Sequence, residues 1–286
     1  MKRGLRIVGV LFASVVVLSA IVTVGFLSGW HIKKHTPEEL APLLKPHFRI
    51  KRPLDGGPFP TVVGFHGCYG VHKRVRDWAD YLVELGYATI MVDSYTGRGF
   101  TPDDVEDVCA GRKFWGSERA GDVLVSLNEI RKLSFVDKNQ LVLIGWSHGA
   151  WTIMDLLALD PPSNLPTNLS RSPDQPLAGV KAVILFYPYC EFPAKARRRG
   201  WTHDIRVLLL IAGRDSIVSS EACLEIVSIL ESKGQPITVH VYPSVDHAWD
   251  LREEDLKGSQ LLRSRDATCD AKRRIMRFLI EALHPP

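Results

Sequence analysis

The sequence predicts one α/β domain built on a mostly parallel, doubly wound sheet. Two observations support this class: short apolar runs recur along the chain, and amphipathic segments of helix length separate them. Most runs are apolar at consecutive positions, which is typical of strands buried on both faces, as parallel strands are. The predicted strands are Thr61–Phe65, Ala88–Val92, Leu141–Ile144, Ala182–Tyr187, Val207–Ala212 and Ile237–Tyr242.

Helices are expected between these strands. One apolar face is marked by Val75, Trp78, Leu82 and Leu85, and another recurs at helical spacing over Ala120–Ile130. Three further helices fit His148–Leu159, Glu221–Ser232 and Ala271–Leu283. Two segments interrupt the alternation, Pro161–Gly179 and Cys190–Asp204, and we expect both to be surface loops on the strand-to-helix side, where α/β folds place binding loops.

The N-terminal segment is the main anomaly in composition. No charged residue occurs from Ile7 to Trp30, and Lys2, Arg3 and Arg6 precede that run. The run meets the requirement of roughly 20 apolar residues for a membrane span and exceeds an ordinary signal-peptide core. We therefore predict that residues 1–30 form a membrane anchor, with a cleaved signal peptide as the alternative.

The basic residues before the run favour a cytoplasmic N-terminus. The rest of the chain would then lie outside the cytoplasm, on the periplasmic side in a bacterium, or be secreted if the segment is cleaved. Six prolines fall between Thr36 and Pro60, so residues 31–59 are expected to be a linker that leads irregularly into the domain. The domain itself is expected to span residues 60–286.

Composition excludes several classes of protein. With 45% hydrophobic and 24% charged residues, the 286-residue chain is neither disordered nor a disulfide-stapled miniprotein. The net charge of +4 is small for this length, which argues against a nucleic-acid partner. The sequence does not indicate an oligomeric state.

A nucleophile motif follows one predicted strand. Leu141–Ile144 runs into Gly145-Trp146-Ser147-His148-Gly149, a G-x-S-x-G pattern, and then directly into a predicted helix. A serine on such a strand-to-helix turn is exposed above the sheet, and the two glycines let the backbone close around it. Ser147 is therefore the candidate nucleophile.

Candidate partners follow in the chain order of a Ser-Asp-His triad. Asp215 comes just after the strand Val207–Ala212, and His247 lies in the loop after the last strand. In this chemistry His247 takes and returns the Ser147 proton, and Asp215 holds the imidazole in the required tautomer. Asp246 and Asp250 flank the histidine as alternatives, but a sequence neighbour rarely reaches the adjacent ring.

The loop after the first predicted strand is expected to supply an oxyanion donor. It reads His66-Gly67-Cys68-Tyr69-Gly70, and we expect the backbone N–H of Cys68 to act with that of His148. Cys68 as a nucleophile is the rival interpretation, and its thiol is expected to be incidental. Further candidates for substrate contact are Tyr69 and Trp146.

The five cysteines are Cys68, Cys109, Cys190, Cys223 and Cys269, an odd number without a CxxC pair, so a zinc site is not expected. They fit an oxidising compartment only loosely. A disulfide between Cys190 and Cys223 is conceivable, although spacing does not fix connectivity.

With these residues in place, the chain resembles members of the dienelactone hydrolase family of the α/β-hydrolase superfamily. The resemblance runs from about Pro60 to the C-terminal helix and rests on FHGCYG (65–70), RDWADYLVELGYATIMVDSYTGRG (76–99), IGWSHGAW (144–151), FYPYC (186–190), AGRDSIV (212–218) and VYPSVDHAWD (241–250). It implies the α/β-hydrolase fold, with Ser147 as nucleophile, Asp215 as acid and His247 as base. Arginines in such enzymes meet a substrate carboxylate, which makes Arg98 a candidate for that contact, although a solvated loop arginine is the favoured interpretation. One departure matters: dienelactone hydrolases proper have cysteine at the position of Ser147, on the strand-to-helix turn known as the nucleophile elbow.

The function expected from the sequence is a serine hydrolase of small carboxylic esters or lactones that works through an acyl-enzyme, without metal or organic cofactor. Because serine replaces cysteine, we expect an ester or lactone other than the dienelactone as substrate. An amidase or exopeptidase using the same triad is one alternative, since substrate choice lies in loops. A catalytically silent binding protein on the same scaffold is the other.

Overall fold

The computed structural model describes residues 15–20, 22–25, 28–201, 203–252 and 261–283. Residues 15–20 and 22–25 are helical, and among the described residues no helix is both long and apolar enough to cross a membrane. Part of the predicted anchor, including residues 1–14, lies outside the described residues. The anchor therefore stays a prediction.

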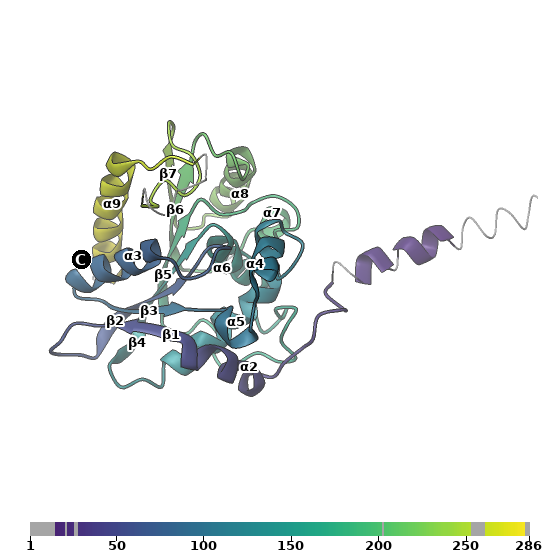
Figure 1. The fold of residues 1–286 in the computed structure, drawn as a ribbon, viewed down its shortest axis with the longest axis horizontal. Helices are drawn as coiled ribbons and strands as arrows, with labels where there is room; N and C mark the ends of the chain where they lie inside the picture. Colours follow the sequence, from purple (N-terminus) through teal and green to yellow (C-terminus); the bar gives the residue numbers. More distant parts are fainter. Residues whose placement is uncertain (1–14, 21, 26–27, 202, 253–260, 284–286) are drawn as a thin grey trace, which may run out of the picture.

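A seven-stranded sheet forms the centre of the domain, in the order β1-β3-β2-β4-β5-β6-β7 (Figure 1). Strands β2 to β7 are parallel, whereas β1 pairs with β3 in the antiparallel sense at one edge. The strands are β1 Phe48–Lys51, β2 Phe59–Phe65, β3 Ala88–Val92, β4 Val136–Trp146, β5 Val180–Phe186, β6 Arg206–Ala212 and β7 Ile237–Tyr242. The predicted parallel α/β architecture is confirmed.

Helices cover both faces of this sheet (Figure 1). Helices α3 and α9 bury Trp78, Leu82 and Leu279 in one apolar cluster, and α2, α5, α6 and α8 contribute to a second cluster against the other face. The helices are α2 Pro37–Leu44, α3 Lys73–Glu84, α4 Pro102–Cys109, α5 Gly116–Ile130, α6 His148–Leu159, α7 Ala196–Arg199, α8 Ser220–Ser232 and α9 Arg265–Leu283, with 3-10 turns η1 Lys45–His47 and η2 Thr96–Arg98.

The predicted linker is ordered where α2 and β1 form, so that part of the prediction was wrong. Thr36 caps α2 through a reciprocal capping box with Glu39, and Pro37 occupies the first turn. Leu40 and Leu44 are completely buried in the core. The prolines that suggested a linker partly mark the start of a helix.

The segment Pro161–Gly179 also differs from expectation. It joins the end of α6 to the start of β5, so it is a helix-to-strand connection and not a strand-to-helix loop. Its middle part packs along α5, where the Thr167 N–H donates to the Ser117 carbonyl and Asn168 Nδ2 donates to Asp122. The loop therefore supports the helix that begins beside the functional edge of the sheet.

Candidate active site

Ser147 stands on a sharp turn between β4 and α6. Its backbone has φ 51° and ψ −114°, a region that non-glycine residues rarely adopt. A side chain on Gly149 would come within 2.0 Å of the Phe65 carbonyl oxygen, and one on Gly145 within 2.6 Å of the Ala150 nitrogen. Both glycines are therefore needed for close packing, and the serine side chain is partly exposed at the carboxyl edge of the sheet.

The structure brings Ser147, His247 and Asp215 together, although they lie up to 100 residues apart. His247 Nε2 is 2.9 Å from Ser147 Oγ, and His247 Nδ1 is 2.8 Å from Asp215 Oδ2. The histidine and aspartate side chains are both nearly buried. Because Nδ1 faces a carboxylate, it carries the proton and leaves Nε2 free to accept the serine proton.

The alternative aspartates are bound elsewhere. Asp246 accepts from the backbone N–H and hydroxyl of Ser216, and Asp250 accepts from Trp78 and Tyr187. Asp93, after β3, accepts from the N–H groups of Tyr95 and Thr96 and so caps the loop that follows that strand. Asp215 is thus the carboxylate that meets the Nδ1 edge of His247.

The loop after β2 lies against Ser147. A methyl group on Gly67 would sit 3.6 Å from the Cβ of Ser147. Within the described part of the chain, the N–H groups of Cys68 and His148 do not donate to any backbone carbonyl. The His148 N–H, next to Ser147 in the chain, and the Cys68 N–H, one residue after Gly67, therefore remain the candidate oxyanion donors.

Two disulfides anchor loops at this edge. Cys68 is bonded to Cys109 at the end of α4, and Cys190, after β5, is bonded to Cys223 in α8. The Cys190–Cys223 pairing agrees with the one proposed from the sequence. The expectation for Cys68 was incomplete, because its sulfur ties the donor loop to α4 instead of being an incidental thiol.

The three substrate-contact candidates differ in position. Tyr69 is 69% exposed next to the donor loop. Trp146 is completely buried and stacks against Phe186, so its prediction as a substrate contact was wrong: it packs in the core on the α3 and α9 side of the sheet. Arg98 makes a bidentate ion pair with buried Asp122, which occupies the donors that a substrate carboxylate would need.

A buried network that the sequence did not reveal supports His247. The ring of Tyr187 lies edge-on to the imidazole, with centroids 4.7 Å apart. Its hydroxyl donates to Asp250 Oδ1 at 2.5 Å and accepts from Arg74 Nη1 at 3.0 Å, while Trp78 Nε1 donates to Asp250 Oδ2. Sequence spacing gave no signal, because these residues come from α3 and two different loops.

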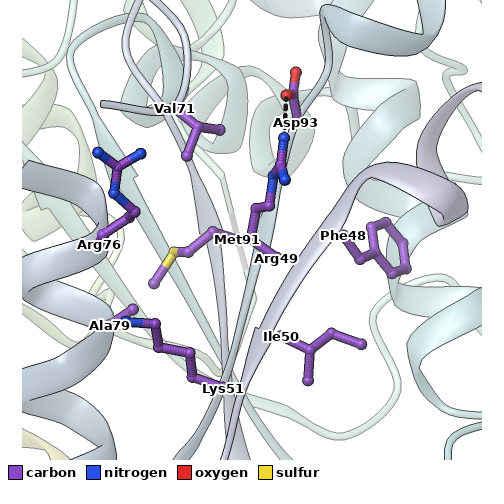
Figure 2. Close-up of a pocket in the computed structure, with 9 residues that line it drawn as sticks. All are labelled: Phe48, Arg49, Ile50, Lys51, Val71, Arg76, Ala79, Met91 and Asp93. Carbon is purple, nitrogen blue, oxygen red and sulfur yellow. Dashed lines mark ion pairs between the residues drawn. The ribbon is translucent and has the colours of Figure 1, made fainter. Parts of the chain in front are cut away.

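A groove of about 470 Å³ lies at the sheet edge, between β1, β3 and α3 (Figure 2). Arg49, Lys51 and Arg76 line it together with apolar side chains, and Arg49 points to Asp93 across an ion pair of 3.9 Å. None of the residues gathered around Ser147 lines it. The site is thus defined by the hydrogen-bonded side chains and not by this groove. Among the described residues, no cluster of His, Cys, Asp or Glu could hold a metal ion.

Solved structures share this fold. A dienelactone hydrolase-like promiscuous phosphotriesterase, P91, from metagenomic libraries is 17% identical, with a TM-score of 0.65, and the match covers 82% of this chain and 92% of P91. Esterase 2 of Thermogutta terrifontis, phosphoramylated by tabun, is 14% identical with a TM-score of 0.57, covering 84% and 91%.

Sequence comparison gives the family. A curated protein of Methylorubrum extorquens named "Putative carboxymethylenebutenolidase" is 36% identical over 47 residues, a match that spans only 16% of either chain. The model of the dienelactone hydrolase family matches residues 49–164 and 170–283, which is most of the chain. The protein therefore belongs to the dienelactone hydrolase family.

Proposed function

We propose that this protein hydrolyses small carboxylic esters or lactones through an acyl-enzyme on Ser147. The observation that carries the proposal is the pair of hydrogen bonds that joins Ser147 Oγ to His247 and His247 to Asp215. This is the geometry of an activated serine nucleophile with an oriented general base.

The proposed reaction has two halves. Ser147 Oγ attacks the substrate carbonyl while its proton passes to His247 Nε2, and the N–H groups of Cys68 and His148 receive the resulting oxyanion. The imidazolium then protonates the leaving alcohol as the C–O bond breaks. Water, deprotonated by His247, attacks the acyl-enzyme in the same way and releases the acid and free Ser147.

The serine in the elbow bears on the substrate class. A serine depends on its general base for activation, whereas cysteine is partly ionised near neutral pH. Simple esters or lactones other than the dienelactone are therefore our proposed substrates, and Tyr69, exposed beside the donor loop, is our proposed substrate contact. An anilide preferred over its matched ester would instead favour the amidase alternative.

The test combines a covalent probe with turnover. A fluorophosphonate forms a bond from phosphorus to the reactive serine oxygen and releases fluoride, so labelling should map to Ser147. Ser147→Ala should abolish labelling and lower kcat for p-nitrophenyl acetate by about 10⁴-fold or more. Ser232→Ala, on the exposed face of α8, serves as the control. Labelling and turnover unchanged in Ser147→Ala would overturn the assignment, and a wild type that does neither would indicate a silent binding protein.

We also propose that the domain works outside the cytoplasm, held by the apolar N-terminal segment. The uncharged stretch from Ile7 to Trp30 and the two disulfides support this, because structural disulfides persist in oxidising compartments. A reporter fused after Pro286 tests it: an export-dependent phosphatase should be active there. Activity of a cytoplasmic reporter alone would contradict the proposal.

A further inference from the structure

Arg119, in the first turn of α5, is completely buried directly behind the two proposed oxyanion donors. Its Nη1 donates to the His66 carbonyl at 2.8 Å and to His148 Nδ1 at 3.1 Å, and its Nε donates to Ser94 Oγ at 3.0 Å. These acceptors belong to the chain segments that follow β2, β4 and β3. One guanidinium therefore joins three strand ends at the functional edge.

The hydrogen bonds fix both imidazoles in the neutral form. His148 Nε2 lies 2.9 Å from the Phe114 carbonyl and must donate, which leaves Nδ1 as the acceptor for Arg119. His66 Nδ1 donates to the Gly67 carbonyl, and its Nε2 accepts from the Ser94 N–H. Burial and the Arg119 charge lower the pKa of His148 to about 3 and that of His66 well below its ordinary value. Neither ring competes with His247 for a proton.

This network holds the donors themselves. The backbone of His148 supplies one proposed donor. His66 begins the loop that supplies the other: Gly67 contacts Ser147, and Cys68 carries the N–H. Because one nitrogen of Arg119 bonds to both segments, it sets the distance between them. A shift of either segment would move its N–H away from the developing oxyanion.

The charge of Arg119 is also poorly compensated. Its hydrogen-bond acceptors are a carbonyl, a hydroxyl and a neutral imidazole, and among the described residues no carboxylate lies within ion-pair distance of it. The carboxylates that act on it from farther away are Asp122, paired with Arg98, and Asp93, bound by backbone N–H groups. A buried positive charge behind the donors favours negative charge in front of them.

We propose that Arg119 is a positioning residue for the transition state: it sets the spacing of the Cys68 and His148 N–H groups and supplies positive potential behind them. The inference rests on the proposed function, in which these groups bind the oxyanion. It adds a residue that touches neither substrate nor nucleophile.

Arg119→Met is the main test and Arg131→Met its matched control. Arg131 lies at the other end of α5 and also donates to backbone carbonyls, those of Pro176 and Ala178, far from Ser147 along the helix. With p-nitrophenyl acetate, well below each unfolding temperature, kcat should fall about 30- to 300-fold in Arg119→Met, with KM within about threefold of the wild type. Arg131→Met should keep the wild-type kcat.

Two readouts separate positioning from mere structural support. The affinity for a boronic acid that forms a tetrahedral adduct with Ser147 should fall in parallel with kcat, while the KM stays unchanged. In Arg119→Met, NMR of labelled histidines should show the pKa of His148 above its wild-type value, because the adjacent cation is gone. A kcat of Arg119→Met equal to that of Arg131→Met, or a loss in KM alone, would overturn the inference.

Arg119→Lys keeps the inference testable if Arg119→Met does not fold. It retains the charge but lacks the planar guanidinium that places Nη1 between His66 and His148 while Nε bonds to Ser94. We therefore expect a kcat between those of the wild type and Arg119→Met, about 5- to 30-fold below the wild type. A wild-type kcat in Arg119→Lys would refute the spacing argument. Failure of the proposed function looks different, because the wild type itself would then neither label nor turn over.

Discussion

Two buried arginines lie near Ser147 on opposite faces of the sheet, and their charges are compensated in different ways. Arg74, from α3, lies 3.6 Å from the buried carboxylate of Asp250 and donates to Tyr187, which packs on His247. Arg119, from α5, has only neutral hydrogen-bond acceptors and packs behind the oxyanion donors. Arg74, which is paired with a carboxylate, lies beside the proposed base His247 and also reaches Gly67, whereas Arg119, without a carboxylate contact, lies behind the proposed oxyanion donors.

The difference follows the charge that each side must carry during the reaction. In the proposed reaction an imidazolium forms at His247, and nearby positive charge would disfavour it. The carboxylate of Asp250 offsets the charge of Arg74 and so reduces this effect. The oxyanion is favoured by positive charge, so the weakly compensated Arg119 suits the oxyanion side. We therefore expect Arg74 and its partners to act mainly on stability and Arg119 to act mainly on kcat.

Asp250→Asn should give the largest loss of stability. It removes the carboxylate from a buried charge pair and weakens its hydrogen bonds with Trp78 and Tyr187, so we expect about 3–5 kcal/mol in the free energy of unfolding. Urea unfolding of Asp250→Asn and Arg119→Met measures the contrast. A larger stability loss in Arg119→Met than in Asp250→Asn would contradict the claim that the Arg74 network acts mainly on stability.

The two disulfides offer a second test of the contrast between effects on stability and effects on kcat. Removal of either disulfide should lower the free energy of unfolding by about 2–4 kcal/mol. The double variants are Cys68→Ala with Cys109→Ala, and Cys190→Ala with Cys223→Ala. Only the first pair holds a donor residue, so only its removal should also lower kcat, by about 3- to 10-fold. Equal kcat values for the two double variants, measured where both are fully folded, would show that the Cys68 loop keeps its position without the disulfide.

Ser94→Ala removes one acceptor of Arg119 and leaves the other two. We expect a stability loss of about 1–2 kcal/mol and a kcat loss of only a few fold, since Nη1 still joins His66 to His148. Thermal unfolding and p-nitrophenyl acetate turnover check both values. A kcat loss as large as that of Arg119→Met would mean that the hydroxyl, and not the guanidinium, sets the geometry.

The neutral imidazoles predict an acid-sensitive oxyanion side. The pKa of His148 is about 3 in the folded protein and near 6.5 when unfolded, so the unfolded state binds more protons between these values. Its stabilising contribution is complete above about pH 6.5 and is lost as the pH falls towards 3, at up to about 1.4 kcal/mol per pH unit. Measured by urea unfolding between pH 4 and 7, the free energy of unfolding should depend less on pH in His148→Gln than in the wild type. Equal slopes for the two proteins would contradict this prediction.

Much of the fold was predictable because burial on both faces leaves a local signal. All six predicted strands form, and most of them are apolar at successive positions, whereas β7 alternates apolar residues with Thr238 and His240. Strand β1 gave no such signal: it has four residues, lies at the edge and exposes Arg49 and Ile50. Helix α2 was obscured by its prolines, although its capping box could have been found in Thr36 and Glu39.

Local patterns are enough to predict the order of Ser147, Asp215 and His247 and the strand ends that carry them, because glycine spacing and buried runs are local properties. The three-dimensional packing was needed to show which aspartate meets His247, that Trp146 lies in the core, that Cys68 is bonded to Cys109, and that Arg119 lies behind the proposed donors. The contacts of His247, Cys68 and Arg119 join residues that are 29 to 53 positions apart in the chain. Their geometry depends on how helices pack across the sheet, which no pattern within a single segment encodes.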